Sequence, residues 1–341
     1  MASTGPRNLI TDVEGLTVGN AQCDALRSGV TVLLPDAPVA AAVDVRGGGP
    51  GTRDTGVLKP EGLVQEIHAI VLSGGSAFGL DAATGAQAYL RERGVGFAVG
   101  PALVPIVPQA ILFDLLNGGD KEWGHRPPYQ DMAFSACEIA SDSFALGTVG
   151  AGFGATTERL KGGLGSASWV METGHTVGAL TAVNAAGNVT MGDGPHFWAA
   201  PFEQDREFGG LGWPETVSPD MTEPRLKGGI AENTTLAIVA TDAALDRNAL
   251  KRIAIIAQTG LARAIYPVHM PTDGDIVFAV STGRRPAPEA PSGLATLGAA
   301  AADTLTRAIA RAVYEAHAFE GDPAGRPAYR DLFGKGTAGG A

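Results

Sequence analysis

The sequence predicts an α/β fold built on a mixed β-sheet. Apolar runs of strand length and of helix length alternate along the 341 residues. Hydrophobic residues make up 45% of the chain, which is enough to fill a sizeable core. The 48 glycines, about twice the usual 7% share, cluster between the apolar runs and predict many tight turns. Because some of these turns join strands as hairpins, a mixed sheet is favoured over a purely parallel one.

Three short apolar runs near the start of the chain predict strands at residues 29–34, 43–46 and 69–73. The second run leads into the turn-forming glycines at 47–51. The third run ends at Gly74-Gly75 and precedes a predicted helix at residues 77–93, which Gly94 terminates. A polar stretch with two prolines, residues 117–131, predicts an excursion over the surface.

Glycines cluster again in the middle of the chain, at residues 150–155 and 161–168, and predict tight structural turns. The sequence GAGFGA at 150–155 lacks the preceding strand and the following acidic residue of a dinucleotide-binding site. No nucleotide cofactor is therefore expected. A strand pair is predicted at residues 177–183 and 188–191, with its turn at Gly187.

The last third of the chain follows a loose stretch with five prolines, residues 194–232, which predicts a surface loop or a flexible connection. The pattern then becomes regular, with strands predicted at residues 235–240 and 276–281. A helix is predicted between them, with one apolar face formed by Leu250, Ile253, Ala257, Leu261 and Ala264. A long alanine-rich helix is predicted at residues 294–318.

Charge and cysteine content exclude several classes of protein. A net charge of −11 and a pI near 5.0 argue against broad attraction to nucleic acid or to anionic membranes. Cys23 and Cys137 lack metal-ligand spacing and the six histidines are scattered, so no metal is expected. No run is apolar enough for a signal peptide or a membrane span. We therefore expect a cytoplasmic protein that acts on small molecules or peptides.

The junction at Asn233-Thr234 places a hydroxyl at the start of a predicted strand, directly after the loose stretch. If the bond before Thr234 breaks, Oγ1 becomes a nucleophile and the new α-amino group, with a reference pKa of about 7.7, becomes its base. Oγ1 itself can attack the Asn233 carbonyl and form an ester that water hydrolyses. On spacing alone, however, an Asn-Thr pair is more often a turn before a strand.

Longer motifs decide between these interpretations. They are VDVRGGGPGTRDT at 43–55, EIHAIVLSGGSAFGLDAA at 66–83, VPIVPQAILFDL at 104–115, KGGLGSAS at 161–168, VGALTAVNAAGNV at 177–189 and the run from GGIAENTT through DGDIVFAVSTG at 228–283. Together they resemble the L-aminopeptidase/D-esterase and β-aminopeptidase family, which includes the 6-aminohexanoate (nylon) oligomer hydrolases. The resemblance spans most of the chain.

The resemblance implies one αββα sandwich domain with mixed sheets over residues 1–341. It also implies a precursor that cleaves itself at Asn233-Thr234, giving an α-chain of residues 1–233 and a β-chain of residues 234–341. The expected assembly is a homo-oligomer, commonly a tetramer of αβ units. Neither a metal nor another cofactor is implied.

The resemblance also assigns catalytic roles. The family nucleophile falls on Thr234, and the acidic pair that orients it falls on Asp273 and Asp275 in the sequence Thr-Asp-Gly-Asp. Two carboxylates around a glycine can hold the new ammonium group and tune its pKa. Serine and glutamate occupy these places in the β-aminopeptidases proper, so this chain matches the nylon-oligomer-hydrolase branch. Without the resemblance, Asp-Gly would indicate a hairpin turn.

Asn184 matches the family asparagine whose side-chain amide helps to form the oxyanion hole, an effect worth about 3–4 kcal/mol in other hydrolases. The nylon-hydrolase branch has a catalytic lysine where this chain has Arg159, and Lys161 follows two residues later. Because arginine stays protonated, either Lys161 reaches the site or the cation acts only through its charge. His269 is the one histidine that its position favours as a pocket residue.

These features predict a self-cleaving amide hydrolase that acts on peptides, amino acid amides or esters, or nylon oligomers. One alternative is an acyltransferase of the ornithine acetyltransferase type, which would pass the acyl group to an amine rather than to water. Another is an uncleaved small-molecule-binding protein, in which the Asn233-Thr234 bond never breaks.

Overall fold

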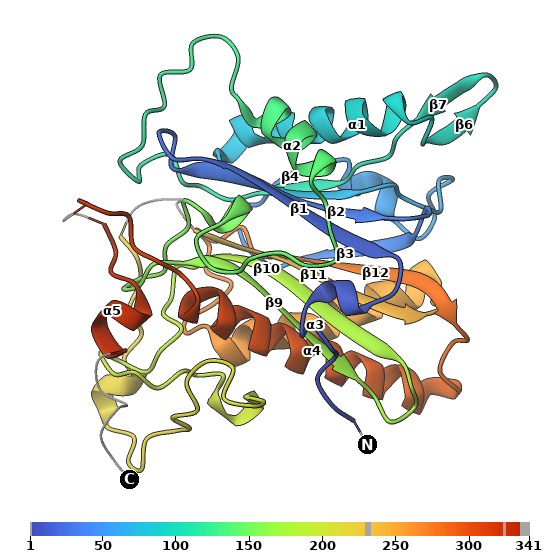
Figure 1. Cartoon of the computed structure of the whole chain (residues 1–341). Helices are drawn as coiled ribbons and strands as arrows, with labels where there is room; N and C mark the ends of the chain where they lie inside the picture. Colours follow the sequence, from blue (N-terminus) through green and yellow to red (C-terminus); the bar gives the residue numbers. More distant parts are fainter. Residues whose placement is uncertain (1, 229–232, 323–324, 335–341) are drawn as a thin grey trace.

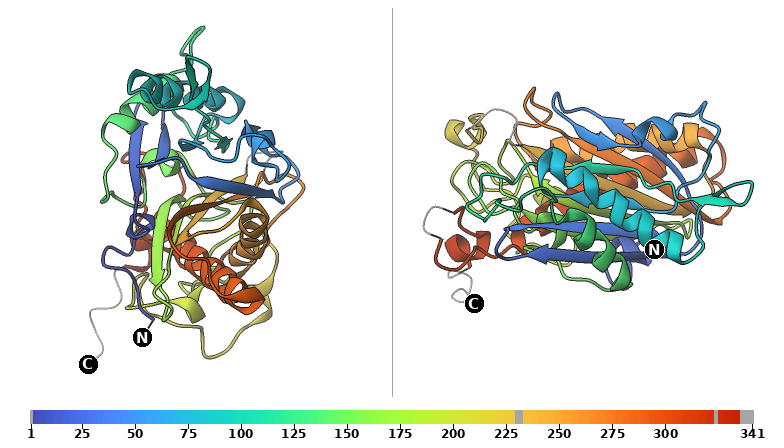
Figure 2. Two further views of the ribbon diagram at one scale, coloured as in Figure 1. Left: turned by 90° about the vertical axis from the view of Figure 1, so that its right-hand side faces the viewer. Right: turned by 90° about the horizontal axis from the view of Figure 1, so that it is seen from above.

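Two five-stranded sheets lie face to face in the computed structural model, which describes residues 2–228, 233–322 and 325–334. Two helices cover the outer face of each sheet, so the layers follow the order α, β, β, α (Figures 1 and 2). Each sheet contains both parallel and antiparallel neighbours. The predicted αββα sandwich with mixed sheets is therefore confirmed.

The first sheet has the strand order β1-β2-β5-β8-β4. Its strands are β1 (Leu16–Cys23), β2 (Ser28–Pro35), β5 (Ile70–Ser73), β8 (Gln109–Ile111) and β4 (Gly51–Arg53). Strands β5 and β8 are parallel, and the other neighbours are antiparallel. Helices α1 (Ala82–Glu92) and α2 (Tyr129–Glu138) pack on its outer face. The sequence predicted β2 and β5, but it did not predict α2.

The second sheet has the strand order β3-β12-β11-β10-β9. Its strands are β3 (Ala40–Val45), β12 (Ile276–Arg285), β11 (Thr234–Ala243), β10 (Thr176–Asn184) and β9 (Gly163–Val170). Only β11 and β12 run parallel to each other among these pairs. Helices α3 (Arg247–Ala264) and α4 (Ala290–Tyr314) cover its outer face. All ten residues of β11 are buried, because this strand lies between the other sheet and the helices.

The remaining elements are short. They are the hairpin β6 (Phe97–Val99) and β7 (Ala102–Val104), the helix α5 (Tyr329–Phe333), and the 3₁₀ turns η1 (Ile10–Asp12), η2 (Thr55–Leu58), η3 (Ser76–Asp81), η4 (Gly150–Gly152), η5 (Ala200–Phe202) and η6 (Pro219–Thr222).

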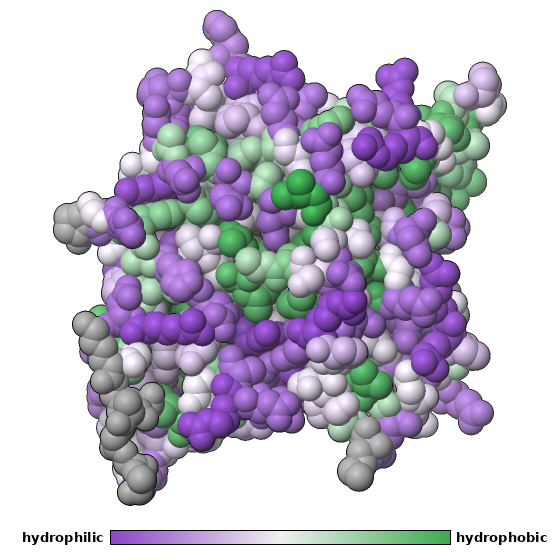
Figure 3. Space-filling model, in the orientation of Figure 1, coloured by the Kyte–Doolittle hydropathy of each residue, from purple (hydrophilic) through white to green (hydrophobic). Residues whose placement is uncertain are grey.

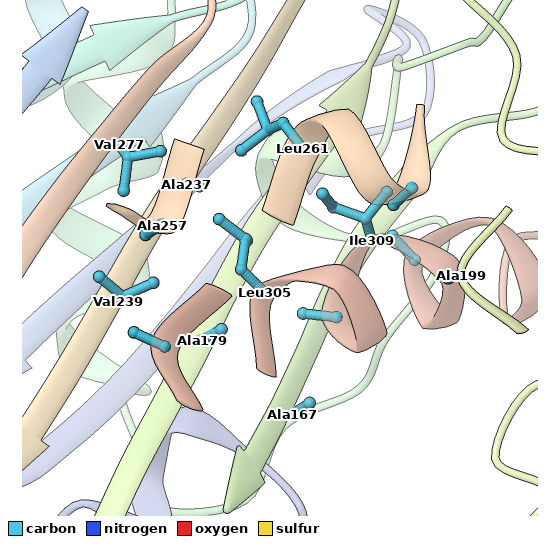
Figure 4. Close-up of a cluster of buried hydrophobic side chains, with 14 of the residues drawn as sticks. Ala167, Ala179, Ala199, Ala237, Val239, Ala257, Leu261, Val277, Leu305 and Ile309 are labelled. Carbon is cyan, nitrogen blue, oxygen red and sulfur yellow. The ribbon is translucent and has the colours of Figure 1, made fainter. Parts of the chain in front are cut away.

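Apolar side chains fill the space between each pair of layers. Between the second sheet and its helices, Leu261 and Leu305 pack against strand residues such as Val239 (Figure 4). The predicted apolar face of α3 is fully buried there. Between the two sheets, Leu72 and Phe278 belong to a second cluster that holds the sheets together. Each such side chain stabilises the fold by about 1.5–3 kcal/mol relative to an exposed position.

The predicted helix at 77–93 was wrong in its first part, which forms the 3₁₀ turn η3. The side chain of Gln109 explains the difference. Its Nε2 donates to the Gly79 carbonyl at 2.5 Å, and its Oε1 accepts from the Ala83 amide at 3.0 Å. Gln109 therefore replaces the bond that would join these two groups in an α-helix. At the other end of the chain, α4 ends at Tyr314 rather than at residue 318.

The predicted strand pair at 177–183 and 188–191 was also wrong in its second member. Strand β10 pairs with β11 on one side and with β9 on the other. Strand β9 lies in the glycine cluster that the sequence had indicated as a turn. Asn188 instead exchanges backbone hydrogen bonds of 2.9 Å with Tyr266. A side chain at Gly165 would overlap the Ala308 carbonyl of α4. These glycines therefore allow a helix to approach a strand closely rather than forming a turn.

Apolar side chains also reach the surface. On the face shown in Figure 3 they gather on the projecting β6–β7 hairpin, where Val99, Leu103 and Val104 are exposed, and in a band across the middle. Of the helices in the described part of the chain, none has both the length and the apolar character needed to cross a membrane.

Candidate active site

The ends of three neighbouring strands, β10, β11 and β12, meet on one side of the second sheet. Because β10 runs antiparallel to β11, its last residue, Asn184, lies opposite the first residue of β11, Thr234. Strand β12 runs parallel to β11, so the residues just before both strands also lie side by side. Asn233 pairs there with Asp273. This topology brings together side chains that are far apart in the sequence.

Thr234, at the start of β11, is buried, with 4% of its surface exposed. Its Oγ1 donates a hydrogen bond to the carbonyl oxygen of Asn233. The backbone amide of Gly274 donates to the same oxygen at 2.9 Å. A side chain at Gly274 would overlap Oγ1 of Thr234, so this position requires glycine. The carbonyl of the peptide bond before Thr234 is thus in contact with both a hydroxyl and a backbone donor.

The residues 272–275, which we call the acidic turn, carry two buried carboxylates beside Thr234. Asp275 Oδ1 accepts the amide of Thr235 at 2.8 Å, and its Oδ2 lies 2.9 Å from Nδ1 of His269. Asp273 Oδ2 accepts the amide of Met270 at 2.8 Å. Burial, and then the negative charge of Asp275, raise the pKa of Asp273 to about 6. The two carboxylates therefore resist being ionised together.

A glycine loop at residues 46–49 supports the acidic turn. The Gly49 amide donates to the Asp273 carbonyl at 2.7 Å, and the Arg46 amide donates to the Asp275 carbonyl at 3.0 Å. A side chain at Gly47 would overlap the backbone of the acidic turn. This close packing explains why the sequence has consecutive glycines after β3.

The carboxamide of Asn184 is held at both ends. Its Oδ1 accepts from the Thr156 amide and from Nζ of Lys227, each at 3.0 Å, and its Nδ2 donates to the Phe113 carbonyl at 2.9 Å. Asn184 is 1% exposed. Sequence reasoning missed Lys227, Thr156 and Phe113. All three lie outside regular elements, where no periodic pattern could have indicated them.

The two cations that the sequence considered have different surroundings. Lys161 is buried, and its Nζ donates to the carbonyls of Phe153 at 2.7 Å and Ala155 at 2.8 Å. Burial lowers the pKa of Lys161 to about 7, against an opposing effect of Asp114. Arg159 instead faces Asp193, with 3.5 Å between Nε and Oδ1. Lys161, not Arg159, therefore lies on the side of Asn184.

A cavity of about 330 Å³ opens beside Asn184. Its walls include Asn184, Lys161, Lys227, Asp114 and Phe319. His269 does not line this cavity and contacts Asp275 instead, so its role as a pocket residue stays a prediction. Within the described ranges, no three His, Cys, Asp or Glu side chains are grouped so that they could hold a metal ion.

Comparison with known proteins gives the family. The model of peptidase family S58 matches residues 8–325. An uncharacterized aminopeptidase of Mycobacterium tuberculosis is 43% identical over 96% of this chain and 98% of its own length. A 6-aminohexanoate-oligomer endohydrolase of Kocuria sp. is 26% identical over 91% of this chain and 87% of its own length.

The fold agrees with these relatives. A solved L-aminopeptidase D-Ala-esterase/amidase of Ochrobactrum anthropi, described as a variant of the Ntn hydrolase fold, superposes with a TM-score of 0.70 at 24% identity. The superposition covers 96% of this chain and 91% of that one. The chain therefore belongs to peptidase family S58 and is an amide or peptide hydrolase of the Ntn-hydrolase fold.

Proposed function

We propose that this hydrolase activates itself by cleaving the Asn233-Thr234 bond and that Thr234 is then its nucleophile. The observation that carries the proposal is the pair of contacts on the Asn233 carbonyl, from Oγ1 of Thr234 and from the Gly274 amide. The products would be an α-chain of residues 1–233 and a β-chain of residues 234–341.

Apart from a water molecule, self-cleavage uses groups that lie at this junction. Oγ1 loses its proton and bonds to the carbonyl carbon of Asn233, and the Gly274 amide stabilises the oxygen that becomes negative. The C–N bond then breaks, and the nitrogen takes up a proton to become the α-amine of Thr234. Water hydrolyses the resulting ester, which leaves a carboxylate on Asn233 and restores the hydroxyl.

The same site would then turn over substrates. The new α-amine of Thr234 accepts the Oγ1 proton as the hydroxyl attacks an amide, and the leaving amine takes up a proton. Asp273 and Asp275 lie next to Thr234 and would hold the amine in position. Asn184 lies opposite Thr234 in the sheet and would donate to the oxyanion. Water finally releases the acid from Oγ1.

The substrates we propose are peptides, amino acid amides or esters, and linear 6-aminohexanoate oligomers. The names of the relatives support amide substrates of these kinds. The cavity of about 330 Å³ beside Asn184, the proposed oxyanion donor, is at the lower end of the usual range for ligand pockets, which favours a small substrate group there.

Intact mass spectrometry of the wild-type protein beside Thr234→Ala and Thr234→Ser tests the proposal. We expect two fragments in the wild type, with the smaller beginning at Thr234, an intact chain in Thr234→Ala and cleavage in Thr234→Ser. Hydrolysis of amino acid p-nitroanilides should fall at least about 10³-fold in Thr234→Ala, because nucleophile removal costs on the order of 10⁶ in a serine hydrolase. A wild-type chain that hydrolyses substrate while uncut would contradict the proposal.

A further inference from the structure

Lys227 makes contacts that neither the sequence motifs nor the proposed mechanism explains. Its half-buried side chain places Nζ 3.0 Å from Oδ1 of Asn184, 3.1 Å from Oγ1 of Thr156 and 3.2 Å from the Thr156 carbonyl. Its backbone amide donates to the Ala186 carbonyl at 2.8 Å, which ties the segment to the turn after Asn184. The ammonium group is therefore held against the carboxamide of Asn184, which is paired with Thr234 on the neighbouring strand.

We propose that Lys227 is a positioning residue for Asn184: it fixes the orientation of the carboxamide and strengthens it as an oxyanion donor. The inference rests on the proposed function, in which Asn184 stabilises the oxyanion on Thr234. The Lys227 ammonium and the Thr156 amide can only donate, so they identify the atom that they contact as the carboxamide oxygen. The carboxamide cannot flip without opposing both donors.

The charge of Lys227 adds to this geometric effect. A hydrogen bond from a charged donor is roughly twice as strong as a neutral one. A cation on the carboxamide oxygen withdraws electron density from Nδ2, and its N–H groups then donate more strongly, by about 10–30% per bond in a connected chain. The donor would thus be polarised before the reaction begins, which is the arrangement that stabilises a developing oxyanion.

Lys161 cannot serve Asn184 in the same way. Its Nζ donates to the backbone carbonyls of four residues, so it holds that loop in place; they are Gly152, Phe153, Ala155 and Gly162. The positive charge of Lys227 also contributes to the lowered pKa of Lys161. Lys227 therefore contacts the carboxamide of Asn184, whereas Lys161 contacts the backbone of the neighbouring loop.

The test compares Lys227→Met, which keeps the stem but removes the charge and the donors, with Lys227→Arg, which keeps both. We expect kcat to fall about 10- to 100-fold in Lys227→Met with KM within about threefold, because removing an oxyanion donor itself costs about 10²–10³. Lys227→Arg should recover part of kcat. Lys251→Met is the matched control, since Lys251 is also a half-buried lysine with Nζ donating to a backbone carbonyl and a side-chain oxygen, here those of Val43 and Asp44 in β3.

Rates are normalised to the cleaved fraction measured by mass spectrometry. If Lys227→Met folds but stays uncut, the rate of self-cleavage becomes the measurement, and the order wild type, Arg, Met is expected there. Equal rates in the Met and Arg variants, or a kcat for Lys227→Met within twofold of the wild type, would overturn the inference. An uncut but active wild type, or an active Thr234→Ala, would instead overturn the proposed function, so the two failures are distinguishable.

Discussion

The two sides of the Asn233-Thr234 junction carry opposite charges and are built in opposite ways. On one side, Asp273 and Asp275 come from a single turn before β12 and bind the backbone around it. On the other side, Asn184, Lys161 and Lys227 come from three separated segments. The acidic residues thus lie within one turn, whereas the side chains of the cationic side meet only through the packing of segments that are far apart in the sequence.

The two sides also respond to pH in opposite directions. The raised pKa of Asp273 means that ionising its carboxyl in the folded protein is unfavourable, so the acidic side loses stability as pH rises. The lowered pKa of Lys161 means that protonating its amine is unfavourable, so the cationic side loses stability as pH falls. In the folded protein the ionised form of Asp273 is therefore unfavourable at high pH, and the ionised form of Lys161 is unfavourable at low pH.

The largest effect outside Thr234 should come from Asp275→Asn. The new amide would present N–H groups to the donors of Thr235 or His269, and it would remove the charge that balances the α-amine. We expect kcat to fall about 10²–10⁴-fold, the range of acid–base catalysis, and more than in Lys227→Met. Steady-state kinetics on the cleaved protein measures it. A smaller loss of kcat than in Lys227→Met would mean that the cationic side contributes more to kcat than the acidic side, contrary to this prediction.

The contrast between the two sides explains what the sequence could predict. Asp273 and Asp275 are two positions apart, just before a strong strand pattern, so the family motif that they form was enough to predict their place beside Thr234. Apolar runs such as β11 and α3 have clear strand and helix patterns, so these elements were predictable from the residues, whereas the αββα order of the layers was implied by the resemblance. Lys227 lies in a stretch without periodicity, and only the packing of residues 156, 184 and 227 together shows that it contacts Asn184.

Replacing Asp273 should change how stability depends on pH. The pKa of Asp273 in the folded protein, about 6, lies above its ordinary value of 3.8, so its contribution to stability is fully present below pH 3.8 and is lost as pH rises through about 6. Asp273→Asn removes this loss. In the uncut Thr234→Ala background, we expect the added substitution to raise the free energy of unfolding by about 1–2 kcal/mol more at pH 8 than at pH 4, after allowance for solvent screening.

Urea unfolding at the two pH values measures this difference. The comparison between single and double variants removes the opposite contribution of Lys161, which both share. A difference that does not change with pH would mean that Asp273 titrates at its ordinary value, and the strain on the acidic side would then be absent.

Arg159→Ala should have the smallest effect, and it decides where the cation of the site lies. Arg159 pairs with Asp193, whose side chain is 69% exposed, and such pairs contribute about 0–1 kcal/mol. Arg225→Ala is a matched control, because Arg225 pairs with the same carboxylate at 2.9 Å. We expect both variants to cleave themselves and to keep kcat within twofold, since neither arginine is among the residues that line the cavity beside Asn184. If Arg159→Ala alone stopped self-cleavage, Arg159 would belong to the cationic side. Its match to the catalytic lysine of the nylon-hydrolase branch would then be a better guide to the cation of the site than the contacts of Lys161 and Lys227.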